Sequence, residues 1–426
     1  MNQRVTRRLI PFLFLLYLVA FLDRVNVGFA ALQMKADLGF GDAVYGFGAG
    51  IFFLGYFAFE IPSNLILERV GPRFWIARIM ISWGVLSSAM ALVTGEASFY
   101  ALRFLLGVAE AGFFPGIVLY LSYWFPAAER ARAVALFMTA TAMSGVIGGP
   151  ISGALLELDG ALGFHGWQWL FAAEGIPAVV LGFAVLRFLT DRPEDARWLA
   201  PEERSRLVAQ LAAEREAVES RHGTGLRRAL THPRVWSLAW LYFAIIVGLY
   251  GVSLWLPQIV RDLGERSDFE IGLLTAIPYL CASVAMVVVG IHSDRSGERR
   301  WHLAGSALVG AAGFALTAAL EAGPAVALST LSLAAAGVWG CFGPFWALPG
   351  GFLAGSAAAG GIALINSIGN LGGFAGPFAL GLFRQATGDF RAGLGLLALS
   401  LLVAAILALR LPREARGSPE RPDRIR

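Results

Sequence analysis

The chain has 426 residues, of which 57% are hydrophobic, and its mean hydropathy is +0.64. The core of a soluble protein of this length cannot bury so large an apolar fraction, which excludes a soluble globular protein. The net charge of +4 does not indicate a nucleic-acid partner, because membrane topology explains where the basic residues lie. Cys281 and Cys341 lie in apolar segments without CxxC spacing and predict neither a disulfide nor a metal site.

Hydropathy divides the chain into twelve apolar segments, each about as long as a helix that spans a bilayer. These segments cover residues 9–30, 44–66, 74–94, 98–120, 132–156, 168–189, 234–258, 271–292, 301–320, 324–347, 359–384 and 390–410. The first follows Arg4, Arg7 and Arg8 without a clear A-x-A cleavage site, and we expect it to stay as an uncleaved helix. The pattern predicts an all-α membrane protein with twelve transmembrane helices.

Basic residues are unevenly distributed between the loops. If both termini lie in the cytoplasm, 26 Lys and Arg residues fall on that side of the membrane and 5 on the other. An excess of positive charge is typical of cytoplasmic loops. The chain is therefore predicted to be a multi-pass protein with both termini in the cytoplasm.

A charged loop over residues 190–233 divides the chain into two predicted bundles, 1–189 and 234–426. Its eight acids and eight arginines, with Pro193 and Pro201, predict a cytoplasmic linker that contains an amphipathic helix.

The two halves repeat one another. Residues 64–73 match residues 290–299 at an offset of 226, and Gly149-Pro150 matches Gly376-Pro377 at an offset of 227. Such parallel repeats are related by an axis along the membrane normal, which predicts two six-helix bundles.

The segment 98–120 carries two charges, Arg103 and Glu110, that are seven residues apart. Two helical turns separate them, so they are expected to share one face, with Gly107 allowing a neighbouring helix to approach. Charges at membrane depth are costly and usually mark a functional site. Glu110 is predicted near the middle of the bilayer, where transporters bind their cargo.

Asp23 and Arg24 lie well inside the first segment. Adjacent residues on a helix point in different directions, so one interpretation is that Arg24 faces a cavity and Asp23 faces Arg103. Arg24 offers a planar, permanently charged fork to a carboxylate, which predicts an anionic cargo. The alternative is an ion-pair cluster that only holds the first and fourth helices together.

Several motifs carry a family resemblance over essentially the whole chain. The loops at 64–73 and 290–299 resemble the G-x-x-x-D-R-x-G-R signature of the major facilitator superfamily. The stretches LDRVNVGFA from Leu22, RFLLGVAEAGFFPG from Arg103 and GIALINSIGNLGGFAGP from Gly361 resemble its anion:cation symporters. Bacterial members import tartrate, sugar acids, hydroxyphenylacetate and related organic acids with protons, and they are similar to animal vesicular glutamate and sialic acid carriers.

The resemblance implies the major facilitator fold and assigns roles by position. It makes Arg24 the substrate-binding arginine, and Asp23 and Glu110 the proton-coupling acids. Burial in apolar surroundings favours the neutral form of a carboxyl group, which is compatible with proton uptake at Glu110. The alternative for Glu110 is a permanently paired structural acid.

Other polar residues in the segments are candidates for orienting a hydroxylated ligand or for packing between helices. Further substrate contacts are predicted at Arg103, Tyr56, Trp346 and Asn366, with Asn370 the weaker candidate. Thr141 stands where several sugar-acid carriers have Gln, which also allows a smaller or less hydroxylated acid.

The remaining charges in or near the segments have simpler interpretations. Glu60 and Glu174 precede prolines and are attributed to freed backbone groups or interface packing. The loop charges are predicted to gate the two bundles without touching cargo, and they are Glu68, Arg69, Asp294 and Arg295.

The sequence carries no enzyme signature. It contains no HExxH, GxSxG or P-loop motif, and its five histidines lack ligand spacing, so neither an enzyme nor a cofactor is predicted. The favoured prediction is a proton-coupled importer of an organic anion in the bacterial inner membrane, working as a monomer. A proton-driven exporter or antiporter of the same fold remains the alternative.

Overall fold

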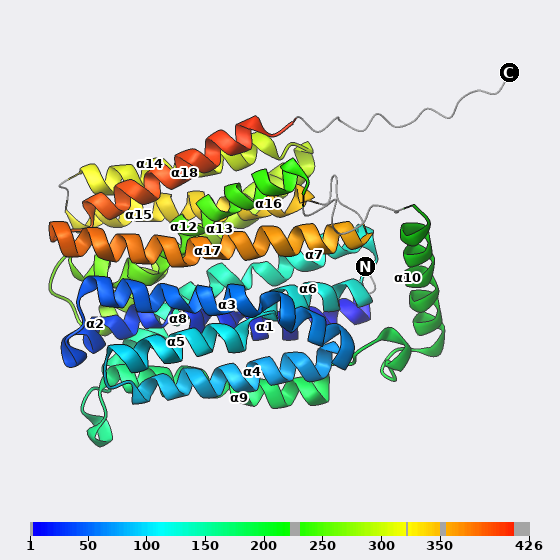
Figure 1. Cartoon of the computed structure of the whole chain (residues 1–426), viewed down its shortest axis with the longest axis horizontal. Coiled ribbons are helices and arrows are strands. Elements are labelled where there is room, and N and C mark those ends of the chain that lie inside the picture. The colour runs from blue at the N-terminus through cyan, green and yellow to red at the C-terminus, as the bar shows by residue number, and fades with distance from the viewer. Residues whose placement is uncertain (1–2, 222–230, 321–322, 350–354, 413–426) are drawn as a thin grey trace.

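The computed structural model describes residues 3–221, 231–320, 323–349 and 355–412, and the long regular elements in these ranges are helices (Figure 1). The N-terminal bundle consists of α1 (Gln3–Val25), α2 (Val27–Leu38), α3 (Asp42–Val70), α4 (Pro72–Ala89), α5 (Glu96–Glu110), α6 (Phe113–Trp124), α7 (Ala127–Met138), α8 (Ala140–Leu156) and α9 (Gly166–Phe188). The C-terminal bundle consists of α12 (Pro233–Arg261), α13 (Asp268–Ser296), α14 (Arg300–Ala319), α15 (Pro324–Gly340), α16 (Phe342–Ala347), α17 (Gly355–Thr387) and α18 (Arg391–Arg410).

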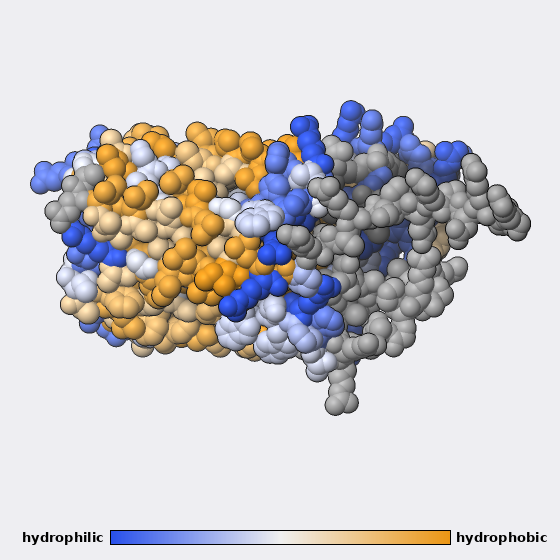
Figure 2. All heavy atoms as spheres, turned by 90° about the horizontal axis from the view of Figure 1, so that it is seen from above, coloured by the Kyte–Doolittle hydropathy of each residue, from blue (hydrophilic) through white to orange (hydrophobic). Residues whose placement is uncertain are grey.

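Eleven stretches of the described chain are long and apolar enough to cross a membrane. The helix α17 has 33 residues and lies among them, but it is not one of the eleven, and it carries Asn366, Ser367 and Asn370. With α17 the long helical segments number twelve, in two bundles, as the sequence predicts. Figure 2 shows apolar side chains over the middle of one face of the molecule, as expected for contact with lipid.

Several predicted spans consist of two helices in succession. The segment 98–120 is not continuous, because α5 ends at Glu110 and α6 begins at Phe113. Gly112 between them has φ +85°, a left-handed conformation that glycine adopts without steric cost. Glu110 therefore lies at a helix end rather than within a helix. The other joints lie at Asn26, Thr139 and Cys341.

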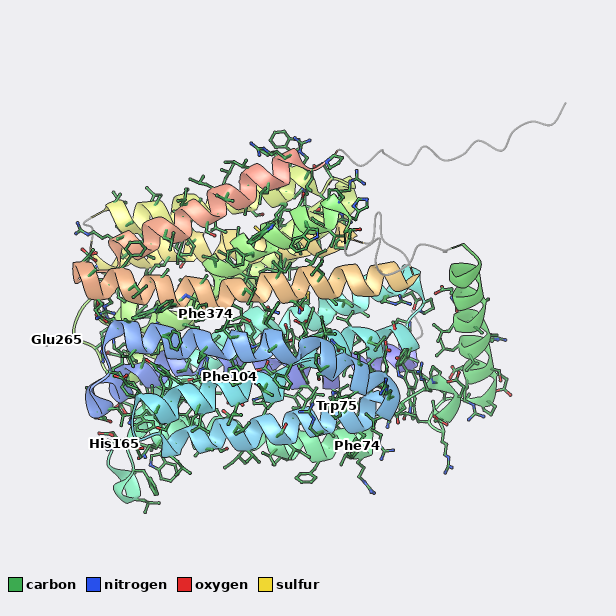
Figure 3. The ribbon with its side chains drawn as sticks, viewed as in Figure 1. Phe74, Trp75, Phe104, His165, Glu265 and Phe374 are labelled. Carbon is green, nitrogen blue, oxygen red and sulfur yellow. The ribbon has the colours of Figure 1, made fainter. Side chains whose placement is uncertain are left out.

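The two ends of the molecule are distinct. We call the end where α1 begins and α18 ends the terminal face, and the helix α10 (Pro201–Arg221) of the predicted linker lies there (Figure 1). The other end, with the loops that hold His165 and Glu265, is the opposite face (Figure 3). Residues 222–230 of the predicted linker lie outside the described residues.

The bundles meet mainly along two helix pairs, α3 with α17 and α8 with α13, and α2 also packs against α12. Backbones approach closely in the half nearer the opposite face, since a Cβ on Gly149 of α8 would lie 2.6 Å from the carbonyl oxygen of Gly272 in α13. A Cβ on Gly46 of α3 would likewise lie 2.7 Å from the carbonyl oxygen of Pro377 in α17. Small residues permit such contact between membrane helices.

Hydrogen bonds between the bundles also gather at the opposite face. Gln33 Nε2 donates to Asp268 Oδ2 at 2.7 Å, and Lys35 Nζ donates to Gln258 Oε1 at 2.9 Å. Tyr45 Oη donates to the carbonyl oxygen of Leu254 at 2.5 Å. The molecule is therefore closed on the opposite face.

Candidate functional site

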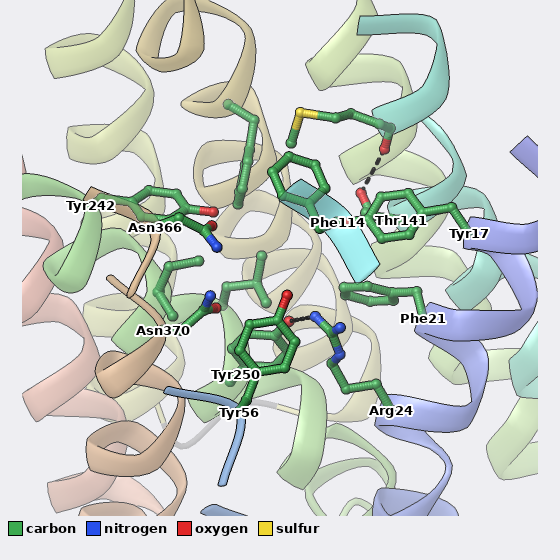
Figure 4. A pocket seen from close by; sticks show the side chains of 14 residues that line it. Tyr17, Phe21, Arg24, Tyr56, Phe114, Thr141, Tyr242, Tyr250, Asn366 and Asn370 are labelled. Carbon is green, nitrogen blue, oxygen red and sulfur yellow. Dashed lines mark hydrogen bonds between the residues drawn. The ribbon is translucent and has the colours of Figure 1, made fainter. Parts of the chain in front are cut away.

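A cavity lies between the two bundles, and Figure 4 shows the side chains that line it. Its polar lining residues are Tyr17, Arg24, Tyr56 and Thr141 of the N-terminal bundle and Tyr242, Tyr250, Asn366 and Asn370 of the C-terminal bundle. Its volume is about 30 Å³. One water molecule needs roughly 10–15 Å³ of such a cavity, so the cavity in this conformation has room for about two waters.

Arg24 is the charged residue that lines the cavity, and it connects the two bundles. Its Nη2 donates to Oε1 of Glu110, and its Nη1 donates to the hydroxyl oxygen of Tyr250 at 2.8 Å (Figure 4). The rings of Phe52 and Tyr56 lie 5.5 Å from the guanidinium carbon. The structure therefore places Arg24 at the cavity, as the sequence predicts, and gives it an internal carboxylate partner.

Tyr250 was not predicted as a partner of Arg24. The two residues are 226 positions apart, which is the offset at which the two halves repeat. Tyr250 in α12 is thus the repeat equivalent of Arg24 in α1. Comparing each charged membrane residue with its repeat equivalent could have found it.

Glu110 is 1% exposed and forms its ion pair with Arg24. The break at Gly112 places this carboxylate at the C-terminal end of α5, against α1. The close approach predicted at Gly107 is confirmed, because a Cβ there would lie 1.9 Å from the carbonyl oxygen of Phe52 in α3.

Asp23 does not face Arg103 in the structure. Its Oδ2 accepts a hydrogen bond from Trp83 Nε1 at 2.6 Å. Its Oδ1 accepts from Ser87 Oγ at 2.6 Å and from Asn26 Nδ2 at 3.1 Å. Asp23 is 1% exposed, so its carboxyl group lies inside the N-terminal bundle beside the joint between α1 and α2.

Arg103 lies away from the cavity and is fully buried. It donates to the backbone carbonyl oxygens of Gly48 at 3.3 Å and Ala49 at 2.9 Å, and its guanidinium lies 5.1 Å from the ring of Phe52. These contacts tie α5 to α3. The predicted pairing failed because helical periodicity gives the face of a residue but not the neighbour that fills it.

The structure brings two of the other predicted substrate contacts, Tyr56 and Asn366, to the cavity, and Asn370 and Thr141 also line it. Trp346 is half-buried beside the cavity and is not among the lining residues. Its ring lies 6.0 Å from that of Phe114 in the other bundle. It therefore packs against aromatic rings, those of Phe114, Tyr242 and Phe345.

Two buried acids, attributed from the sequence to freed backbone groups or interface packing, accept hydrogen bonds from side chains. Glu60 accepts hydrogen bonds from Asn366 Nδ2 and, at 2.7 Å, from Ser367 Oγ, both in the other bundle. Glu174 accepts from Ser152 Oγ at 2.7 Å within the N-terminal bundle. Freed backbone groups therefore do not explain either acid. Among the described residues, no three His, Cys, Asp or Glu side chains form a group that could hold a metal ion.

The four predicted gating residues lie at the terminal ends of α3 and α13, and all are exposed. Asp294 pairs with Arg299 Nη1 at 2.5 Å within its own bundle. Glu68, Arg69 and Arg295 form no hydrogen bond or ion pair with another described residue. Within the described ranges, the structure thus shows no hydrogen bond or ion pair between the bundles through the side chains of these four residues.

Comparisons with known proteins agree with this architecture. The sequence profile of the Major Facilitator Superfamily matches residues 13–377 and, a second time, 265–425. A protein of Agrobacterium vitis named for tartrate transport is 53% identical over 98% of this chain and 92% of its own length. A quinolone resistance transporter of Acinetobacter baumannii is 45% identical over 95% of this chain and 93% of its own. The xylose transporter XylE of Escherichia coli, in a partially occluded inward open conformation, superposes with a TM-score of 0.77 at 16% identity, over 97% of this chain and 99% of that one. The chain belongs to the major facilitator superfamily and is a membrane transporter rather than an enzyme.

Proposed function

We propose that this protein imports an organic anion together with protons by alternating access. The observation that carries the proposal is the ion pair between Arg24 and Glu110 at the cavity wall, with Tyr250 of the other bundle on the same guanidinium. A buried arginine of this kind attracts a carboxylate. Glu110, which already pairs with Arg24, can give up that ion pair when it binds a proton.

The cavity chemistry supports an anionic cargo. Arg24 is 5% exposed, and its planar fork suits a carboxylate better than a point charge does. The other polar groups of the lining are tyrosine hydroxyls, a threonine hydroxyl and two amides, which suit a ligand that carries hydroxyl groups. The relative named for tartrate transport supports a tartrate-like dicarboxylate, a sugar acid or an aromatic carboxylate as the substrate class.

Coupling follows from competition for Arg24. While Glu110 is ionised it neutralises the guanidinium, and a substrate carboxylate has to displace it. When Glu110 binds a proton it loses its attraction for Arg24, and the substrate takes its place. A buried charge left without a partner is costly, so protonation of Glu110 and binding of the substrate carboxylate to Arg24 favour each other.

Asp23 is the second proposed proton site. Its three hydrogen-bond donors come from α4 and from Asn26 beside the helix joint, so movement at this joint changes the solvation of the carboxyl group. Arg103 holds α5 against α3 and thereby supports the position of Glu110. We propose this supporting role for Arg103 in place of direct substrate contact.

Transport requires the bundles to separate, because a cavity of about 30 Å³ is too small for a dicarboxylate. The excess of basic residues on the terminal face supports a cytoplasmic location for that face in the bacterial inner membrane. Both bundles, 1–189 and 234–426, and the cavity between them belong to one chain, which supports a monomeric functional unit with the linker 190–233 between them.

The test is uptake by proteoliposomes that contain the purified protein, under an inward proton gradient. The panel is labelled tartrate, galactonate, glucarate, hydroxyphenylacetate and phthalate. Accumulation of an acid that collapses when a protonophore is added supports the proposal. Absence of gradient-dependent uptake of every acid in the panel contradicts it.

A second candidate function is proton-driven export, which the similarity to the quinolone resistance transporter favours. An exporter of this fold would expel a quinolone such as norfloxacin from loaded vesicles in exchange for protons. Norfloxacin efflux that requires an inward proton gradient and stops when a protonophore is added would favour export, and absence of such efflux would count against it.

A further inference from the structure

Glu60 is a fully buried carboxylate whose hydrogen bonds both cross the interface between the bundles. It belongs to α3, and its two donors, Asn366 and Ser367, belong to α17 and are each 3% exposed. None of the described basic side chains forms an ion pair with it. The hydrogen bonds from α17 are therefore what offsets the burial of this carboxyl group in the present structure.

The position of Glu60 sets it apart from the contacts at the opposite face. It follows Tyr56 by four residues, which places it about 6 Å closer to the terminal face by helical rise. Apart from the bond between Arg24 and Tyr250 at the cavity itself, the tight glycine contacts and the other polar bonds described between the bundles lie on the far side of the cavity. Glu60 thus stands on the terminal side of the cavity, where α3 and α17 have to separate when that side opens.

Asn366, one of the two donors to Glu60, also lines the cavity. Asn366 uses one of its two Nδ2 hydrogens for Glu60, which fixes the amide and leaves its carbonyl oxygen as the acceptor that it offers to a ligand. A carbonyl oxygen only accepts hydrogen bonds, and it therefore favours a hydroxyl or amine donor on the ligand. Separation of α3 from α17 removes the bond that fixes this orientation.

We propose that Glu60 is a positioning residue that couples closure of the bundle interface, between α3 and α17, to the orientation of the Asn366 amide in the cavity. In the conformation closed on the terminal side it holds α3 to α17 and presents the Asn366 carbonyl oxygen to the ligand. In the open conformation both effects disappear. Because a ligand shifts a conformational equilibrium only through its different affinity for the two states, a hydroxyl that uses Asn366 favours closure. The role in ligand orientation rests on the proposed transport function, whereas the role in closure does not.

The closure role is tested without substrate by a double-mutant cycle of Glu60→Gln and Ser367→Ala. Ser367 is not a lining residue of the cavity, so its loss acts through Glu60. The readout is the distance distribution between nitroxide labels on Val70→Cys and Ser296→Cys, which are exposed at the terminal ends of the two bundles. The labelled proteins carry Cys281→Ser and Cys341→Ala and are measured in lipid nanodiscs.

With Glu60 present, Ser367→Ala is expected to lower the ratio of closed to open molecules by about tenfold or more, because a charged group loses a hydrogen bond. In the Glu60→Gln protein, Ser367→Ala should lower the ratio of closed to open molecules by a factor at least about threefold smaller, because the bond from Ser367 to a neutral amide is weaker. Equal shifts in the two backgrounds, or no shift in either, would overturn the proposal.

Ser152→Ala is the matched control. Ser152 donates to the buried Glu174 at 2.7 Å, the distance of the bond between Ser367 and Glu60, but both residues belong to one bundle. This substitution should leave the distance between the bundles unchanged. A shift as large as that of Ser367→Ala would mean that any weakened buried acid loosens the protein, and it would count against a specific role of Glu60.

The orientation role is tested by competition of unlabelled tartrate and succinate against labelled tartrate in exchange. Glu60→Gln is expected to weaken tartrate by about tenfold while succinate, which has no hydroxyl donor, changes little. Equal weakening of both acids would overturn this part. If the unmodified protein carries neither acid nor any other member of the panel, the proposed function fails, and the substrate-free cycle still decides the closure role.

Discussion

Replacement of Glu110 by glutamine is the most direct test of how protons are coupled to transport. Glutamine has nearly the shape of glutamate, and its amide oxygen still accepts a hydrogen bond from Arg24, but it carries no charge. In the Glu110→Gln protein the ion pair becomes a hydrogen bond from a charged guanidinium to a neutral amide. A substrate carboxylate then meets a guanidinium that is no longer neutralised by an internal acid.

The expected magnitude follows from the contact that is changed. Hydrogen bonds to charged groups contribute about 1.5–3 kcal/mol; the pair with two opposite charges lies at the upper end of this range, and the bond to a neutral amide lies at or below the lower end. The difference of about 1–2 kcal/mol corresponds to roughly 5- to 30-fold in affinity. At a pH where Glu110 is ionised, the variant should therefore bind substrate about 5- to 30-fold more tightly than the unmodified protein. The advantage should vanish as the pH falls and Glu110 of the unmodified protein becomes protonated.

The assay has two parts, binding of labelled tartrate between about pH 5.5 and 8.5 and transport in proteoliposomes. An intact coupling proton supports about tenfold accumulation per pH unit of gradient. We expect Glu110→Gln to abolish accumulation driven by the proton gradient and to retain exchange of labelled for unlabelled substrate. Glu174→Gln, which changes a buried acid away from the cavity, serves as the control and should accumulate substrate normally. Gradient-driven accumulation by Glu110→Gln would refute the reasoning.

Three further predictions concern other contacts. Arg24→Lys should raise the KM for the transported acid by about tenfold or more, because an ammonium group does not reproduce the fork that reaches Glu110 and Tyr250. Arg103→Lys should mainly lower the melting temperature and should change KM much less than Arg24→Lys does. Gly149→Ala should open the opposite face, since its Cβ would meet the Gly272 carbonyl oxygen at 2.6 Å; thiol labelling of cysteines at that face reports the change, and Gly305→Ala, whose Cβ meets nothing within 4 Å, should not show it. Partial burial acts to raise the pKa of Glu298 in the loop before α14, but hydrogen bonds from the Trp301 amide and from the amide and ring of His302 outweigh it and leave the pKa below its ordinary value. Because folding lowers its pKa, Glu298 stabilises the folded protein above the pKa of the unfolded state and loses this effect as the pH falls through the folded pKa. The difference in melting temperature between the unmodified protein and Glu298→Gln should therefore shrink between about pH 6 and about pH 3.5. A difference that stays constant over this range would contradict the assignment.

The architecture of this protein could be predicted from its sequence because the bilayer imposes strong rules. Apolar segments of sufficient length have to become helices, and an asymmetric loop charge indicates their orientation. Arg24 and Glu110 could be singled out for the same reason, since a charge in an apolar segment is rare and costly. The prediction that Arg24 reaches a cavity agrees with the structure because the residue lies deep within its helix.

The partners of these charges could not be predicted, because they depend on how the helices pack. Periodicity allowed Asp23 to face Arg103, yet Asp23 bonds to Trp83 and Ser87, and Arg103 bonds to backbone carbonyls of α3. The break at Gly112 could not be read from hydropathy, since apolar residues continue on both sides of it.

The order of residues along the chain was enough to show which side chains carry costly charges at membrane depth and how many helices surround them. It took the packed bundles to show that Arg24 meets Glu110 and Tyr250, and that Glu60 reaches across the interface to Asn366 and Ser367. The physical reason is that the cost of burying a charge is a local property of the chain, whereas the group that offsets this cost comes from another helix whose position is set by the packing of both bundles.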